Sequence, residues 1–242
     1  GWTWIGYPST ATMTVTEALA NLTPTQGDVI KSKNKTAVYR NGAWMSSFTI
    51  TPGTGLMYKS SASGNVTLTY PSGAKGEAAV EEADNLHWTP NASAYPSNMT
   101  VIAVVELDGA ELVTETTEGY ELAAFADGEC RGSFRLMPVE GRCMAILTIA
   151  GDEAAGLRFA LYDAATGEEW HDATQSLDYE TDAVVGDIDA PYVVRFRSAG
   201  VDEWENAVNV YPNPVGRGQK VSLGLDAGTT GKVQVEIVNA LG

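Results

Sequence analysis

The sequence predicts an all-β fold made of two small β-sandwich-like modules and a partial third module at its C-terminal end. Short runs of β-branched and apolar residues recur along the chain, and Gly or Asp turn signals separate them at intervals of ~8–12 residues. Only one stretch has a convincing helical pattern. This spacing is typical of sandwiches, because βαβ units would place a helix between successive strands.

The first 74 residues contain strand-like runs, one short helical stretch and a tight-turn signal. Residues 12–16 alternate polar and apolar side chains, which predicts a half-buried strand. Thr16 is expected to cap a short helix over residues 17–22, which Pro24 would end. Asn41-Gly42 predicts a tight hairpin, because both central positions of a type I′ turn need positive φ. Four further strands are expected at 36–40, 43–48, 56–59 and 65–70.

Residues 85–198 repeat this pattern. Asp108-Gly109 and Asp127-Gly128 each follow an apolar run and predict tight turns. The expected strands are 100–107, 120–126, 131–136, 144–149, 157–162 and 192–197.

Charge is distributed unevenly along the chain, which carries a net charge of -16 and has a pI of about 4.4. Residues 1–75 hold six Lys or Arg and two Asp or Glu, whereas residues 76–200 hold six Arg and 24 acidic residues. The charge changes sharply near residue 76, and linker-like residues occur near 71–76 and 198–201. Together these features predict modules at 1–74, 85–198 and 201–242. The acidity argues against nucleic-acid partners and anionic membranes, and no apolar run approaches the ~20 residues of a membrane helix.

The sequence offers no recognisable catalytic motif and suggests neither an enzyme nor a cofactor. It contains only two histidines, His87 and His171, without metal-ligand spacing to each other. His171 is interpreted as part of a solvated strand or loop edge beside a buried Trp170. The acidic residues between Glu180 and Asp189 offer oxygens for Ca²⁺, but they lack a recognisable loop spacing, so a solvated acidic loop is favoured.

Aromatic residues of the first module are the candidate ligand-binding residues. Flat rings on a sheet face stack on sugars, and the same rings fill small cores, so core packing is favoured and ligand stacking stays open. The candidates are Trp2, Trp4, Tyr39, Trp44 and Tyr58. Any ligand is expected at the first module or its junction with the second. Because the middle segment is so acidic, neutral glycans or an acidic protein partner are expected rather than a polyanion.

Cys130 and Cys143 are the only cysteines. A secreted pair within one domain is more often bridged than free. A tight turn at residues 138–141 would hold the two positions too far apart along a hairpin, so a bridge needs a wide loop or strands that are not hairpin partners. Both states remain open at this stage.

The C-terminal segment has the most specific resemblance to a known family. The run Val-Asn-Val-Tyr-Pro-Asn-Pro-Val at residues 208–215, with strand-like runs at 219–223 and 232–242, resembles the start of the type IX secretion C-terminal sorting domain of Bacteroidetes. The motif residues are Tyr211, Pro212, Asn213 and Pro214. The resemblance implies an Ig-like module, present here only in part, that interacts with the secretion machinery. Residues 208–211 are expected to form a short edge strand, because the prolines that follow cannot donate to a ladder.

The middle segment is similar to an uncharacterised β-sandwich module of large secreted Bacteroidetes proteins. The similar residues are 121–132, with Ala-Phe-Ala-Asp-Gly-Glu-Cys-Arg-Gly, and 157–168; residues 1–60 resemble a companion module. These resemblances imply a non-catalytic binding or adhesion protein, extracellular or on the outer-membrane surface of a Gram-negative cell. Its partner would be a glycan or an extracellular protein. The alternatives are an accessory region of a larger secreted peptidase or glycoside hydrolase, and a structural spacer.

Overall fold

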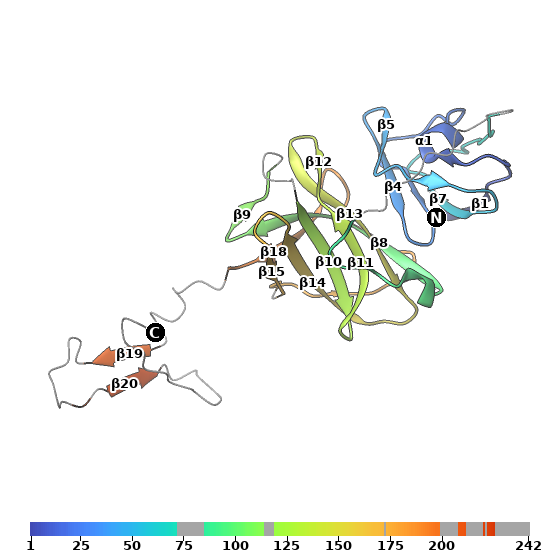
Figure 1. Ribbon diagram of the computed structural model, residues 1–242. Coiled ribbons are helices and arrows are strands. Elements are labelled where there is room, and N and C mark those ends of the chain that lie inside the picture. The colour runs from blue at the N-terminus through green and yellow to red at the C-terminus, as the bar shows by residue number, and fades with distance from the viewer. Residues whose placement is uncertain are drawn as a thin grey trace. The chain divides into compact units, whose positions relative to one another are not determined.

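A computed structural model describes residues 1–71, 85–113, 119–171, 173–198, 208–211, 220 and 222–225. The described chain is nearly all β, so the predicted fold class is confirmed (Figure 1). It forms two compact units, Gly1–Arg197 and Ser198–Gly242. Within the first unit, two sheet systems with separate cores lie on either side of the predicted boundary at residues 75–84.

The N-terminal module, residues 1–71, is built on a five-stranded antiparallel sheet in the order β1-β7-β3-β4-β5. A two-stranded ladder of β2 and β6 and the one-turn helix α1 pack with it. The bounds are β1 Trp2–Gly6, β2 Met13–Thr14, α1 Val15–Ala18, β3 Val29–Lys31, β4 Thr36–Arg40, β5 Ala43–Met45, β6 Thr49–Ile50 and β7 Gly55–Lys59.

Local predictions for this module are wrong at the helix and at residues 65–70. The helix α1 spans Val15–Ala18 rather than residues 17–22, and the strand predicted at 12–16 is only Met13–Thr14. The helix cap is Thr14, not Thr16: the Thr14 hydroxyl accepts a hydrogen bond from the Glu17 backbone N–H, and the Glu17 carboxylate accepts one from the Thr14 N–H. This capping box satisfies two N-terminal donors at once, and Thr16 has no acidic residue at the matching position. Residues 65–70 form no strand, although Val66, Leu68 and Tyr70 still pack on the core.

The middle module, residues 97–197, consists of two sheets packed face to face. The first has the order β11-β10-β14-β15, and β16 also pairs with β14. Its strands are β10 Tyr120–Ala126, β11 Glu129–Arg135, β14 Gly156–Asp163, β15 Glu168–Trp170 and β16 Leu177–Asp178. In the second sheet β12, β13 and β8 are antiparallel, β9 also pairs with β8, and β17 and β18 run parallel to β8. Its strands are β8 Ser97–Leu107, β9 Ala110–Glu111, β12 Met137–Val139, β13 Arg142–Gly151, β17 Val184–Val185 and β18 Tyr192–Phe196.

The predicted tight turns are confirmed. Both residues of Asn41-Gly42, Asp108-Gly109 and Asp127-Gly128 have positive φ, between 48° and 85°. Glycine carries this conformation without a Cβ penalty, and Asn and Asp tolerate it. The turns set the register of three hairpins and so decide which face of each strand is buried.

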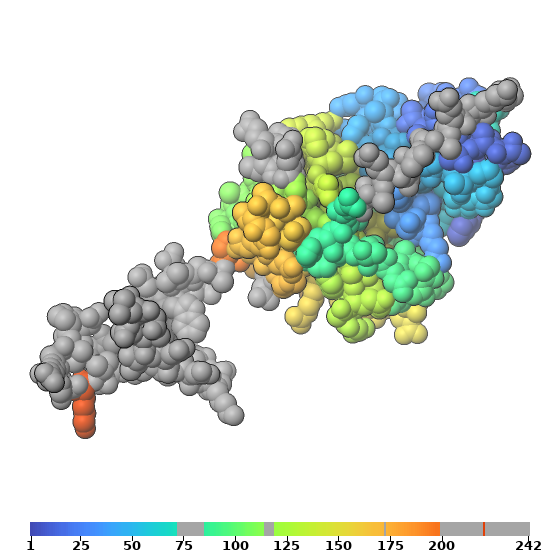
Figure 2. Space-filling model, in the orientation of Figure 1, coloured from blue at the N-terminus to red at the C-terminus, as the bar shows by residue number. Residues whose placement is uncertain are grey.

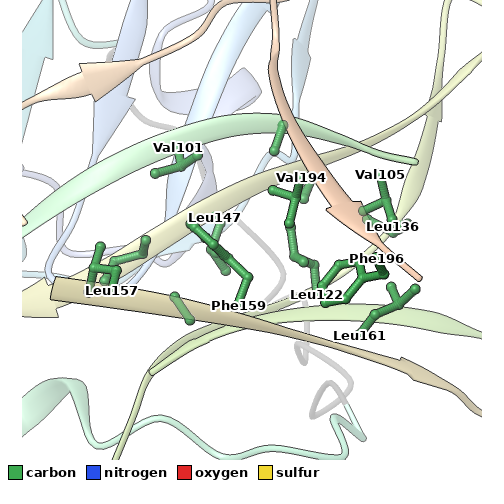
Figure 3. Packing of buried hydrophobic residues seen from close by; sticks show 14 of the residues in the cluster. Val101, Val105, Leu122, Leu136, Leu147, Leu157, Phe159, Leu161, Val194 and Phe196 are labelled. Atoms are coloured by element: carbon green, nitrogen blue, oxygen red, sulfur yellow. The ribbon is translucent and has the colours of Figure 1, made fainter. Parts of the chain in front are cut away.

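Apolar side chains from the facing sheets form the main core (Figure 3). Leu122, Phe159 and Leu161 of the first sheet point toward Val101 and Val194 of the second. Burying each such side chain stabilises the fold by ~1.5–3 kcal/mol.

A second apolar layer joins the two modules. Val29 and Val38 of the N-terminal sheet pack with Ile102, Val104 and Ile146 on the opposite face of the second sheet. Strand β8 is therefore buried on both faces, which explains its unbroken apolar run at residues 101–105. Figure 2 shows the blue N-terminal module lying directly against the yellow-green surface of the middle module.

Residues 85–96, here named the covering segment, cross the outer face of the first sheet. The His87 ring stacks on Tyr162 at 3.8 Å, and Trp88 contacts Phe125 edge-on. The buried Glu121 carboxylate accepts hydrogen bonds from the backbone N–H groups of His87 and Trp88, at 2.6 and 2.9 Å. The segment includes the 3-10 helix η1, Ala92–Ala94, and its green atoms are visible on the middle module in Figure 2.

The second unit contains β19, Val208–Tyr211, paired antiparallel with β20, Ser222–Leu225. The strand predicted at residues 208–211 is confirmed. Pro212, Asn213 and Pro214 lie outside the described residues.

Candidate functional site

A buried lysine fixes the junction of the two modules. Lys31 is only 1% exposed, and its Nζ lies 2.7 Å from Asp182 Oδ1 and 3.2 Å from the carbonyl oxygen of Asn98. The ammonium also lies 4.5 Å from the ring centroid of Trp2, whose indole N–H donates to the Asp182 carbonyl oxygen. Burial lowers the pKa of Lys31, and the Asp182 carboxylate opposes that shift.

Arg40 joins the modules a second time. Its guanidinium donates two hydrogen bonds to Glu140 and two to Asp189, at distances between 2.6 and 3.1 Å. The same hydrogen bonds hold the pKa values of both carboxyl groups below their usual range. Bidentate geometry of this kind fixes orientation as well as charge.

The acidic segment around residues 180–189 therefore pairs with the N-terminal module. Asp182 and Asp189 pair with Lys31 and Arg40, and the Asp187 carboxylate accepts from the N–H groups of Asp189 and Ala190. Within the part of the chain that the structure describes, no group of three acidic, His or Cys side chains is placed to hold a metal. The opposite charges of the two modules were the sequence signal for this pairing.

Three hydroxyls meet where the modules touch. Thr36 Oγ1, from the N-terminal sheet, lies 3.1 Å from Thr100 Oγ1 and 2.8 Å from Thr148 Oγ1, both in the second sheet of the middle module. All three threonines are buried. The hydroxyls satisfy one another, as buried polar groups must.

A cleft of about 520 Å³ opens beside this threonine cluster, and we call it the junction cleft. Both modules and the covering segment line it. Six of its side chains are short hydroxyl or amide groups: Asn34, Thr36, Ser46, Ser47, Ser133 and Thr148. The apolar part of the wall consists of Phe48, Leu86, Phe134 and Ile146, and its charged side chains are Lys35 and Arg135. None of the described lining residues is acidic, in a chain whose net charge is -16.

The five candidate aromatic residues do not form one site. Trp44 and Tyr58 are 7% and 8% exposed within the N-terminal core, and Tyr39 packs edge-on against Trp44. Trp2 lies at the junction, beside Lys31. Trp4 alone of the five is largely exposed, at 74%, and none of the five is among the described residues that line the junction cleft.

Both histidines bond the same carboxylate. His87 Nε2 lies 2.8 Å from one oxygen of Glu169, and His171 Nε2 lies 2.7 Å from the other. These hydrogen bonds lower the pKa of Glu169. Trp170 is buried as predicted.

The possible disulfide between Cys130 and Cys143 is not formed, since both are free thiols in the structure. Cys130 lies on β11 and pairs with Phe125 in the first sheet, whereas Cys143 lies on β13 and pairs with Pro138 in the second. The chain changes sheets at Leu136, between β11 and β12. The hairpin of β12 and β13 turns tightly at Glu140 and Gly141, so a wide loop does not exist.

We expect neither thiol to react readily in the folded protein. Burial raises the pKa of Cys130 and of Cys143 to about 11, so only about one thiol in a thousand is ionised at pH 8. After treatment with iodoacetamide at pH 8, intact mass measurement should show slow labelling of the native protein. In guanidinium without reductant, the same measurement should show two added groups. Labelling that appears only after reduction would contradict free thiols.

Comparison of the chain with protein-family models, curated proteins and solved structures finds no match in any of the three. The fold and site therefore define a structural class: an all-β protein whose two docked modules enclose a polar cleft. In the described part of the chain, no helix has the length and apolar character needed to cross a membrane.

Proposed function

We propose that this chain belongs to a non-catalytic extracellular binding or adhesion protein and that it binds a glycan in the junction cleft. The observation that carries the proposal is the cleft itself. At about 520 Å³ it lies within the ~300–1,000 Å³ of small-ligand sites, and it combines apolar wall with short polar side chains.

The junction gives this cleft a defined shape. Its two sides come from different modules, which Lys31, Arg40 and the shared apolar layer hold together. Binding sites work best when packed elements fix their geometry before the ligand arrives. Hydroxyls of Ser46 and Ser47 offer both donors and acceptors, as sugar recognition requires.

Export through the type IX machinery is the second half of the proposal. It is supported by the motif at Tyr211 to Pro214, whose first residue ends strand β19. The secretion machinery would then be a partner of residues 201–242, and the protein would act outside the cell or on its outer surface.

Filling the cleft should abolish glycan binding. Ser47 is exposed and lines the cleft, so Ser47→Trp places a large ring there without opening a core. On a glycan array we expect the parent chain to bind a defined set of glycans and this variant to lose at least ten-fold in affinity for them.

Ser63→Trp is the matched control, since Ser63 is an exposed serine of the same module that is not among the cleft's described lining residues. It should bind as the parent does. Trp4→Ala tests the one exposed candidate ring. Binding that survives Ser47→Trp and disappears with Trp4→Ala would move the site to the outer part of strand β1 and refute the cleft.

A further inference from the structure

We propose that the ligand of the junction cleft is an acidic oligosaccharide, one whose sugars carry carboxylates, such as a uronide. This inference rests on the proposed function and names its ligand class. The overall charge of the chain points the other way, so the argument depends on where charge lies locally.

Arg135 of the cleft wall differs in its partner from four other cations of the first unit. Lys31, Arg40, Arg142 and Arg195 each form an ion pair with a carboxylate. Arg135, which lines the cleft, instead donates to the carbonyl oxygen of Asn85 at 2.7 Å. A carbonyl accepts a hydrogen bond without neutralising the charge of the donor.

Lys33, next in the chain to the lining residue Asn34, also donates to a carbonyl oxygen. Its Nζ donates to the carbonyl oxygen of Ser93 at 3.3 Å, next to Ala92 of the cleft wall. Among the described residues, neither Lys33 nor Arg135 forms an ion pair with a carboxylate, and both side chains are exposed. Arg135 therefore brings a cation without a described carboxylate partner to a cleft whose described lining holds no acid, and Lys33 adjoins the lining residue Asn34.

An arginine of this kind is suited to a carboxylate. The planar guanidinium still has donors to offer, and charge-assisted hydrogen bonds are about twice as strong as neutral ones. The acidic surface around the cleft would repel a long polyanion. Salt screens charges that lie beyond a Debye length of ~8 Å, so a short acidic ligand in the cleft would interact mainly with the charges nearest to it.

The rest of the wall favours a sugar over an acidic peptide. Four lining side chains that are not buried, Asn34, Ser46, Ser47 and Ser133, carry short hydroxyl or amide groups, which match a ligand with a hydroxyl on nearly every carbon. Leu86 and Phe134, both partly exposed, offer apolar surface to the C–H faces of the rings. An extended peptide would instead need main-chain pairing along a strand edge.

Calorimetric titration of the full chain with trigalacturonic acid tests the inference, with galactotriose as the neutral counterpart and triglutamate as the acidic peptide. We expect trigalacturonic acid to bind at least ten-fold more tightly than either, and its affinity to fall as NaCl rises from 50 to 300 mM. Arg135→Gln should weaken binding by about ten-fold or more, because a charge-assisted hydrogen bond is lost.

Arg158→Gln is the matched control, since Arg158 is an exposed arginine of β14 that is not among the described residues of the cleft wall. It should change nothing. Equal loss in both variants would show a non-specific charge effect and overturn the inference, as would tighter binding of triglutamate or no binding of trigalacturonic acid. A third outcome is that galactotriose binds, that Ser47→Trp abolishes this binding and that Arg135→Gln leaves it intact. This outcome would overturn the inference of an acidic ligand but not the proposed function.

Discussion

Replacing Lys31 by alanine should lower the free energy of unfolding by about 3 kcal/mol and uncouple the two modules. Removing one partner of a buried ion pair costs ~3–5 kcal/mol, and the lower end applies because Asp182 is 40% exposed and regains water. The variant also empties space beside Trp2. Urea unfolding followed by tryptophan fluorescence should show two transitions where the parent shows one.

Two variants separate charge from packing at this position. Lys31→Met keeps most of the hydrocarbon and should recover part of the loss, because it avoids the cavity. Lys59→Ala is the matched control: its ammonium also lies near Trp2, at 5.8 Å, but the side chain is only partly buried. It should cost less than about 1 kcal/mol. A cost equal to that of Lys31→Ala, or a single unshifted transition, would show that Lys31 does not hold the junction.

Gly132→Ala should destabilise the middle module by about 3 kcal/mol or more. A Cβ at this position would collide with the Thr148 carbonyl oxygen and would lie 3.2 Å from Ile149 Cα. Both atoms belong to the backbone of β13, a central strand that cannot move aside without breaking its ladder with β8. Overpacking of this kind typically costs ~1–3 kcal/mol and more when backbone is the obstacle.

Gly55→Ala controls for the general effect of adding a methyl group. Gly55 is also a strand glycine, in β7, and no atom lies within 4 Å of the position that its Cβ would occupy. It should change the free energy of unfolding by less than ~1 kcal/mol in either direction. Thermal melts of both variants check the pair, and a Gly132→Ala protein as stable as Gly55→Ala would show that β11 and β13 do not approach so closely.

Much of the local structure follows from the sequence alone. Strand β10 has the predicted bounds, and Asn41-Gly42 forms the predicted hairpin, because two residues with the right backbone preferences suffice to set a turn. The sequence also predicted the strand at residues 208–211. Residues 65–70 have strand-like alternation but no strand, since a strand also needs a neighbour to pair with.

The candidate site was less predictable. The sequence predicted that any ligand would bind at the first module or at its junction with the second, and it named aromatic rings such as Trp44, which the tertiary structure buries. Seven of the cleft's described lining residues are small or hydroxyl-bearing (Thr36, Ser46, Ser47, Pro90, Ala92, Ser133 and Thr148), and such residues carry no distinctive motif. The uneven charge of residues 1–75 and 76–200 was the one signal that the two modules dock.

The sequence by itself determined the all-β class, the turns and the alternation of buried and exposed positions, because each depends on a few neighbouring residues. Tertiary structure alone decided that Lys31 meets Asp182, 151 positions away, and that Cys130 and Cys143 lie on different sheets. Tertiary structure also decided that this strongly acidic chain forms a cleft whose described lining residues include no Asp or Glu. The physical reason is that such contacts depend on how whole sheets pack, and packing energy is shared among many side chains whose partners no local pattern specifies.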